Sequence, residues 1–304
     1  MGLKEYSKTD LLFIIFLLIL LSILPLFIRS SYLLTLALTS YLFGVLVAIY
    51  DLFYIRSGYI NLGYTYMIAS CGFAIAISIN RLPPTLWPLG AIALALGLCS
   101  VILIPAIRLR GPFYSVSTLL YPFTLPPIAR LFPDLFGGDV GIYVRPIIGD
   151  FIALYYSAIA LGISILIMLV LITSTRLGIY LVMIRDDETL AESSGIRIQR
   201  IKIISHIIVV LMVTAIMIFY AQASGVVSVE LSDPIPLLIY ALMASAIYKP
   251  GSSIYSFMGG IALWWLDGYM RAYIYDLRLI IASTLLLAVY LIRGVGIGVR
   301  AKIH

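Results

Sequence analysis

Residues 151–173 read FIALYYSAIALGISILIMLVLIT, a run without a single charged side chain. A helix rises about 1.5 Å per residue, so this run is long enough to cross the roughly 30 Å hydrocarbon core of a bilayer. Similar apolar runs recur along the chain and are separated by charged residues, proline and glycine. This pattern predicts an all-α polytopic membrane protein.

The composition leads to the same class. Of the 304 residues, 62% are hydrophobic and 11% are charged, whereas soluble proteins are about 45–50% apolar and about 25% charged. So few charges cannot cover a surface that faces water, which excludes a soluble enzyme, a disordered protein and a DNA-binding domain. The net charge of +6 is explained by Lys and Arg at the cytoplasmic ends of spans and needs no nucleic-acid partner.

The apolar runs predict a single transmembrane domain over residues 1–304, a bundle of eight to ten helices. The first run is expected to remain as an uncleaved helix. Pro122, Pro126 and Pro127 predict that the fifth run is broken or re-entrant, and the eighth and ninth form either two tilted spans or one re-entrant pair. The candidate spans are residues 11–28, 32–50, 60–79, 86–107, 113–131, 151–173, 203–223, 234–248, 252–266 and 278–293.

The distribution of basic residues orients the chain. Lys and Arg concentrate in the cytoplasmic loops of membrane proteins, and most of the 20 Lys and Arg residues fall on one side if both termini are cytoplasmic. This topology makes residues 174–202 a long cytoplasmic connection and residues 132–150 a Gly-rich outer loop. We expect a multi-pass protein of the plasma membrane.

The cytoplasmic connection contains the signals of a short helix. Asp186 or Asp187 can cap its start, and Glu188 lies where a carboxylate favours the positive end of the helix dipole. Gly195 fits a left-handed stop. These signals predict a short helix across the cytoplasmic face, and an ordinary solvated loop helix is the alternative.

The same stretch resembles a known family. Residues 175–196, TRLGIYLVMIRDDETLAESSGI, resemble the cytoplasmic loop of the permease subunits of branched-chain amino acid ABC transporters, although Ile179, Met183, Leu190 and Ser193 depart from its pattern. GYINLGY at 58–64 and LRGPFY at 109–114, followed by FGGDVGI at 136–142, are similar to three further blocks of that family, in the expected order.

The resemblance implies the membrane-spanning permease subunit of an ATP-driven importer. An extracytoplasmic binding protein would deliver a branched-chain or related amino acid, a homologous second permease would complete the path, and two ATPase subunits would dock below. The chain contains no G-x-x-x-x-G-K-[ST] motif, so ATP would be hydrolysed by those separate subunits. We therefore expect a non-catalytic chain that needs no cofactor and no metal.

In this reading the short helix is a coupling helix seated in a groove of an ATPase. Leu190 and Ala191 would pack against the ATPase, and the neighbouring carboxylates would make polar contacts. The residues assigned to this role are Arg185, Asp186, Asp187, Glu188, Leu190, Ala191, Glu192 and Gly195.

Polar side chains within the apolar runs are candidates for the translocation path. A hydroxyl or amide without a partner is costly in lipid, so these groups are expected to point inward. Hydrogen bonding between helices is the alternative explanation. The selected residues are Asn61, Tyr66, Ser117 and Tyr121.

Two other classes of protein remain open from the residues alone. An ion-coupled secondary transporter needs no ATPase, but such carriers commonly place ionisable residues within their spans, and the runs contain few. A membrane-embedded transferase is the second alternative, because Asp186, Asp187, Glu188 and Glu192 together offer carboxylate oxygens for Mg²⁺.

Overall fold

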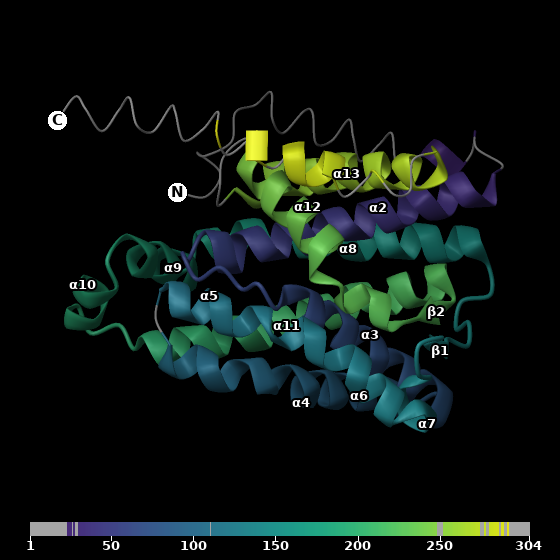
Figure 1. The fold of residues 1–304 in the computed structure, drawn as a ribbon, viewed down its shortest axis with the longest axis horizontal. Coiled ribbons are helices and arrows are strands. Elements are labelled where there is room, and N and C mark those ends of the chain that lie inside the picture. The colour runs from purple at the N-terminus through teal and green to yellow at the C-terminus, as the bar shows by residue number, and fades with distance from the viewer. Residues whose placement is uncertain are drawn as a thin grey trace.

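The computed structural model of the chain shows helices that run along a common direction (Figure 1). The predicted span 11–28 lies largely outside the described part of the chain, and the predicted span 278–293 is described only in part. The structure describes residues 23–25, 27, 30–109, 111–247, 252–273, 277, 280–285, 287–288 and 291.

Helix α2 (Ser31–Tyr50) lies at the centre of the bundle. It continues directly into a π-helical turn, η2 (Asp51–Ile55), and every residue from 37 to 50 is buried. A helix that is apolar on all sides is expected to be buried on all sides. Its neighbours are α8 (Phe151–Thr173), α11 (Ile198–Ser224) and α13 (Ser253–Tyr273).

Small residues bring α2 and α13 close together. A Cβ atom added to Gly44 would lie 2.8 Å from the carbonyl oxygen of Phe257, and one added to Gly260 would lie 2.9 Å from Cα of Gly44. Helices in membranes gain much of their packing energy from such close backbone approach. Any side chain at these two positions would push the helices apart.

Helices α3 (Tyr64–Arg81) and α4 (Trp87–Arg108) pack against each other and against α11. The next run is interrupted, as its prolines predicted: α5 (Pro112–Leu119) is followed by a 3₁₀ turn, η3 (Tyr121–Thr124), and then by α6 (Leu125–Leu131). The apolar side chains exposed along these helices suit a lipid or partner-helix environment. They include Leu89, Val101, Val116, Leu120 and Phe123.

Two small substructures close opposite ends of the bundle (Figure 1). At one end, β1 (Ile142–Tyr143) pairs antiparallel with β2 (Val226–Val227), next to α7 (Pro133–Phe136); we call this the β end. At the other end lie α9 (Arg176–Asp186) and α10 (Glu188–Ser193); we call this the α10 end. The long helix α8 connects the two ends.

The last part of the chain continues from the β end. A 3₁₀ turn, η4 (Val229–Ser232), leads into α12 (Pro234–Ile247), which packs on α13. Helix α12 covers residues 234–247 of the predicted run 234–248. Among the described residues, three helices are long and apolar enough to cross a membrane: Ser31–Ile55, Phe151–Thr173 and Ile198–Ser224.

Two predicted boundaries were wrong. Helix α11 begins at Ile198 rather than at residue 203. The prediction started too late because charged residues in the first turn lower its hydropathy. Helix α13 continues to Tyr273 instead of ending at residue 266. The acidic residue that suggested an end, Asp267, is buried, and its carboxylate binds Arg271 one turn later.

Candidate functional site

The α10 helix has a well-defined start and stop. The Asp187 carboxylate accepts hydrogen bonds from the backbone N–H groups of Thr189 and Leu190, at 2.8 and 3.0 Å. At the other end Gly195 has φ +85°, and the N–H of Ile196 donates to the carbonyl of Ala191 at 3.1 Å. This is a Schellman stop, so the predicted cap and the predicted left-handed glycine are both confirmed.

One face of α10 is anchored on its own chain. Ala191 is 1% exposed and belongs to a small apolar cluster that is separate from the main core. We call this group the Tyr59 cluster. It includes both Ala191 and Ile196, the two positions whose apolar side chains commonly meet at a Schellman stop. Its buried members are Tyr59, Tyr114, Ile184, Ala191, Ile196 and Ile198.

The expectation that Ala191 packs against another protein was therefore wrong for this structure. Its side chain already contacts the interior, and a helix turns by about 100° per residue, so consecutive residues face different directions. Leu190 points outward and is 62% exposed. The apolar contact that α10 offers to its surroundings comes from Leu190.

The acidic residues of this segment have separate partners. Asp186 pairs with Arg185, with 2.8 Å between Nη2 and Oδ1, Asp187 caps the helix, and Glu188 accepts a hydrogen bond from the Tyr59 hydroxyl. Within the described residues no group of acidic, His or Cys side chains is arranged to hold a metal ion. Asp186, Asp187 and Glu188 are thus engaged with three different partners.

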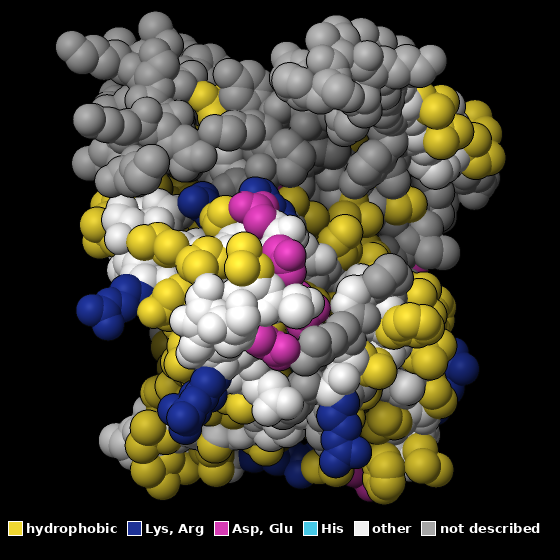
Figure 2. Space-filling view, turned by 90° about the vertical axis from the view of Figure 1, so that its left-hand side faces the viewer, with side chains coloured by type: hydrophobic (Ala, Val, Ile, Leu, Met, Phe, Trp, Pro, Cys, Tyr) yellow, Lys and Arg dark blue, Asp and Glu magenta, His cyan; other side chains and the backbone are white. Residues whose placement is uncertain are grey.

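The α10 end carries both signs of charge. Figure 2 shows acidic side chains in a row near the middle of this end and basic side chains on several sides of them. The exposed charged residues of α9, α10 and the start of α11 are Arg176, Arg185, Asp186, Asp187, Glu192, Arg197 and Arg200. Figure 2 also shows hydrophobic side chains on this face; within α10 itself Leu190 is the exposed apolar side chain, and Ile179 of α9 is exposed at the same end.

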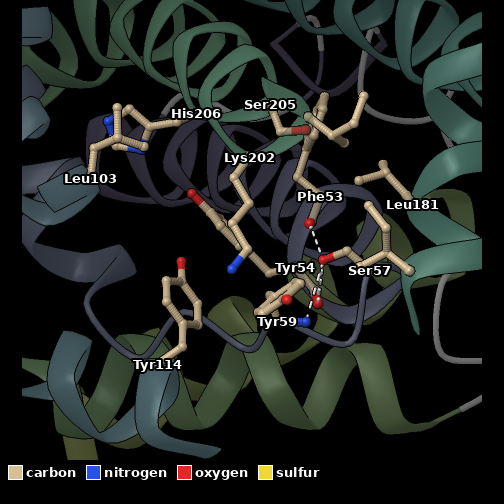
Figure 3. A pocket seen from close by; sticks show the side chains of 12 residues that line it. Phe53, Tyr54, Ser57, Tyr59, Leu103, Tyr114, Leu181, Lys202, Ser205 and His206 are labelled. Carbon is tan, nitrogen blue, oxygen red and sulfur yellow. Dashed lines mark hydrogen bonds between the residues drawn. The ribbon is translucent and has the colours of Figure 1, made fainter. Parts of the chain in front are cut away.

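A small cavity lies behind α10, between η2, α5, α9 and α11. Its volume is about 40 Å³, enough for a few water molecules. Figure 3 shows the Lys202 ammonium reaching from α11 toward the rings of Tyr59 and Tyr114. Ser205 and His206 line the same cavity, and their side-chain atoms Oγ and Nε2 are buried without a hydrogen-bond partner among the described residues.

The four residues selected for the translocation path lie elsewhere. Asn61 is fully buried, and its Oδ1 accepts from the N–H of Gly63 at 2.9 Å. Tyr66 and Tyr121 donate to backbone carbonyls of α4 at 3.1 and 3.2 Å. Ser117 donates to the carbonyl of Tyr114 at 2.8 Å. Each makes a local or helix-to-helix hydrogen bond, which is the alternative explanation given above, and none lines the cavity.

Sequence reasoning missed Tyr59 and Lys202. Tyr59 appeared only within the block at 58–64, and Lys202 was counted only as a cytoplasmic charge. The available signal was the position of Lys202, since a lysine that enters an apolar helix needs a partner for its ammonium.

Comparison with known proteins decides the family. A family model described as the permease component of branched-chain amino acid transport systems matches residues 32–290. The chain belongs to this family. The match includes α2 to α13 and therefore both ends of the bundle, the Tyr59 cluster and α10.

Family membership places the chain among membrane-embedded transport permeases and agrees with its all-α fold and apolar helices. No curated protein and no solved structure matches the chain. The roles of individual residues therefore rest on the geometry described above.

Proposed function

We propose that this chain is the membrane-spanning subunit of an ATP-driven importer of branched-chain or related amino acids. Membership of the permease family supports the class of cargo. In this proposal a binding protein delivers the amino acid at the β end, a second, homologous permease completes the path, and two ATPase subunits dock at the α10 end. The α10 end then faces the cytoplasm, as the distribution of basic residues predicts.

The observation that carries the proposal is the construction of α10. Its inner face is fixed by Ala191, its start by Asp187 and its stop by Gly195. Its outer face presents Leu190 among exposed charges. A single apolar anchor with a polar rim is the usual anatomy of a protein–protein contact. A rigid helix can also transmit force, whereas a loose loop cannot.

The test is retention of the ATPase subunits by tagged permease after detergent extraction. Burying a leucine side chain is worth about 1.5–3 kcal/mol, so Leu190→Ala should weaken ATPase binding roughly 10- to 100-fold. The fold should be unaffected, because this side chain is exposed in the permease. The matched control is Leu135→Ala, which truncates a leucine that is 40% exposed on α7 at the β end.

Leu135→Ala should retain the ATPase at the wild-type ratio. Equal retention by Leu190→Ala and wild type would show that the ATPase docks elsewhere. If the wild-type permease retains no ATPase and vesicles take up amino acid without ATP, the ATP-driven reading itself is wrong.

A further inference from the structure

Tyr59 lies where four parts of the chain meet. It follows η2 in the turn that leads to α3, and it is 8% exposed. Its hydroxyl donates to the Glu188 carboxylate on α10. Its ring meets the ring of Tyr114, on α5, edge to face, with 5.5 Å between the two ring centroids. Hydroxyl and ring therefore contact different elements.

Lys202 brings α11 to the same point. Its ammonium lies 3.8 Å from the centre of the Tyr59 ring and donates to the carbonyl of Leu109, just after α4, at 3.0 Å. A cation over an aromatic face is attracted by the ring quadrupole, more strongly when both are shielded from water. Tyr59 is thus held from two sides, by a carboxylate and by an ammonium.

The turn that follows Tyr59 is itself fixed to the bundle. The side chain of Asn61 accepts from the N–H of Gly63 at 2.9 Å, and the hydroxyl of Thr118 on α5 accepts from the N–H of Leu62 at 3.1 Å. A movement of Tyr59 is therefore passed to the first turn of α3 and to α5 rather than absorbed by a flexible loop. Coupling between distant sites travels through such contiguous contacts.

On these contacts, and resting on the proposed function, we propose that Tyr59 is a positioning residue that links α10 to α3, α5 and α11. When an ATPase moves α10, the Glu188–Tyr59 hydrogen bond carries the movement to the start of α3, and the Lys202–Tyr59 contact carries it to α11. Leu190 binds the ATPase, whereas Tyr59 transmits the displacement. Docking and transmission are then separable by mutation.

The experiment uses the complete transporter in proteoliposomes with ATP, and measures ATPase retention, ATP hydrolysis and uptake of labelled amino acid. Tyr59→Phe removes the hydroxyl and keeps the ring. Because bonds to charged groups are among the stronger hydrogen bonds, uptake per ATP hydrolysed should fall about tenfold, with ATPase retention within about twofold of wild type. Glu188→Ala should lower uptake per ATP to the same level, and the double variant should be no worse than either single one.

The control is Tyr41→Phe. It removes a buried hydroxyl that donates to the carbonyl of Ile159 on α8 at 2.8 Å, a contact in which no residue of α10 takes part. Uptake per ATP should stay at the wild-type value in this variant. If uptake per ATP falls equally in Tyr41→Phe, the effect of Tyr59→Phe reflects a general loss of stability of the helix bundle, and the proposal is overturned.

Three further outcomes show which of the two proposals is wrong. If Tyr59→Phe keeps wild-type uptake per ATP, the link is refuted while the importer reading stands. If Tyr59→Phe instead loses the ATPase, Tyr59 shapes the docking face and the transmission role is wrong. If wild-type permease retains no ATPase and takes up amino acid without ATP, both proposals fail together.

Discussion

Replacing Gly195 by alanine isolates the backbone contribution to α10. Gly195 has φ +85°, and nothing lies within 4 Å of a Cβ atom built on it. An alanine there meets no neighbour, so its cost is that of a left-handed backbone for an L-residue, about 1–2 kcal/mol. A helix of six residues is not stable by itself. The cost should therefore fall on α10 and not on the bundle.

The hydrogen bonds at risk are those of the Schellman stop. The N–H of Gly195 donates to the carbonyl of Glu192 at 2.9 Å, and that of Ile196 donates to Ala191 at 3.1 Å. A loss of 1–2 kcal/mol raises the open population by about 5- to 30-fold. Hydrogen exchange of the amides in residues 189–196, measured by mass spectrometry on the purified permease, should accelerate by that factor.

Two other glycines provide matched controls. Gly149 has no positive φ and no neighbour within 4 Å of a built Cβ, so Gly149→Ala should leave exchange unchanged. Gly225 has φ +72° and, like Gly195, no neighbour within 4 Å of a built Cβ atom, but it ends α11 at the β end. Gly225→Ala should cost as much as Gly195→Ala and leave residues 189–196 unaffected. If Gly195→Ala and Gly149→Ala give the same exchange in residues 189–196, the account of the α10 stop is refuted.

Two further predictions concern stability and topology. Arg271→Ala leaves the buried Asp267 carboxylate without its guanidinium and should cost about 3 kcal/mol, whereas Asp267→Asn leaves a half-exposed Arg271 that water can solvate. The unfolding temperature in detergent should therefore fall more for Arg271→Ala, and equal falls would contradict the argument. In a protein without its native cysteines, Ser194→Cys and Asp139→Cys should react with an impermeant maleimide from opposite sides of the membrane. Labelling of both from one side would show that the span count between them is wrong.

Local chemistry made several elements predictable. The run 151–173 coincides with α8 because it is uniformly apolar and because Asp150 caps its start, with the carboxylate accepting from the N–H of Ala153 at 3.0 Å. Prolines predicted the break between α5 and α6, and Asp187 and Gly195 predicted the bounds of α10. In each case the deciding residue lies within a few positions of the feature.

Features that depend on distant residues were not predictable. The sequence does not show that Ala191 is buried, because two aromatic members of its cluster, Tyr59 and Tyr114, are far away in the chain. Helix α9 was missed because its apolar stretch, LGIYLVMI at 177–184, is too short to cross a membrane and is flanked by charged residues on both sides. The hydroxyls proposed for the path have carbonyl partners on neighbouring turns and helices, which only the packing of α3, α4 and α5 reveals.

The orientation of α10 also has a consequence for how the sequence diverges. Ala191 is fitted to Tyr59 and Ile184 of the same polypeptide, so substitutions at 191 should be compensated within this gene. The side chain of Leu190 is exposed. In the proposed assembly it contacts the ATPase, so the ATPase sequence determines which side chain fits at position 190. Relatives should therefore show co-variation of position 191 within the permease and of position 190 between two genes. A hybrid transporter that combines the permease with a relative's ATPase should be repaired by a change at 190 and not at 191.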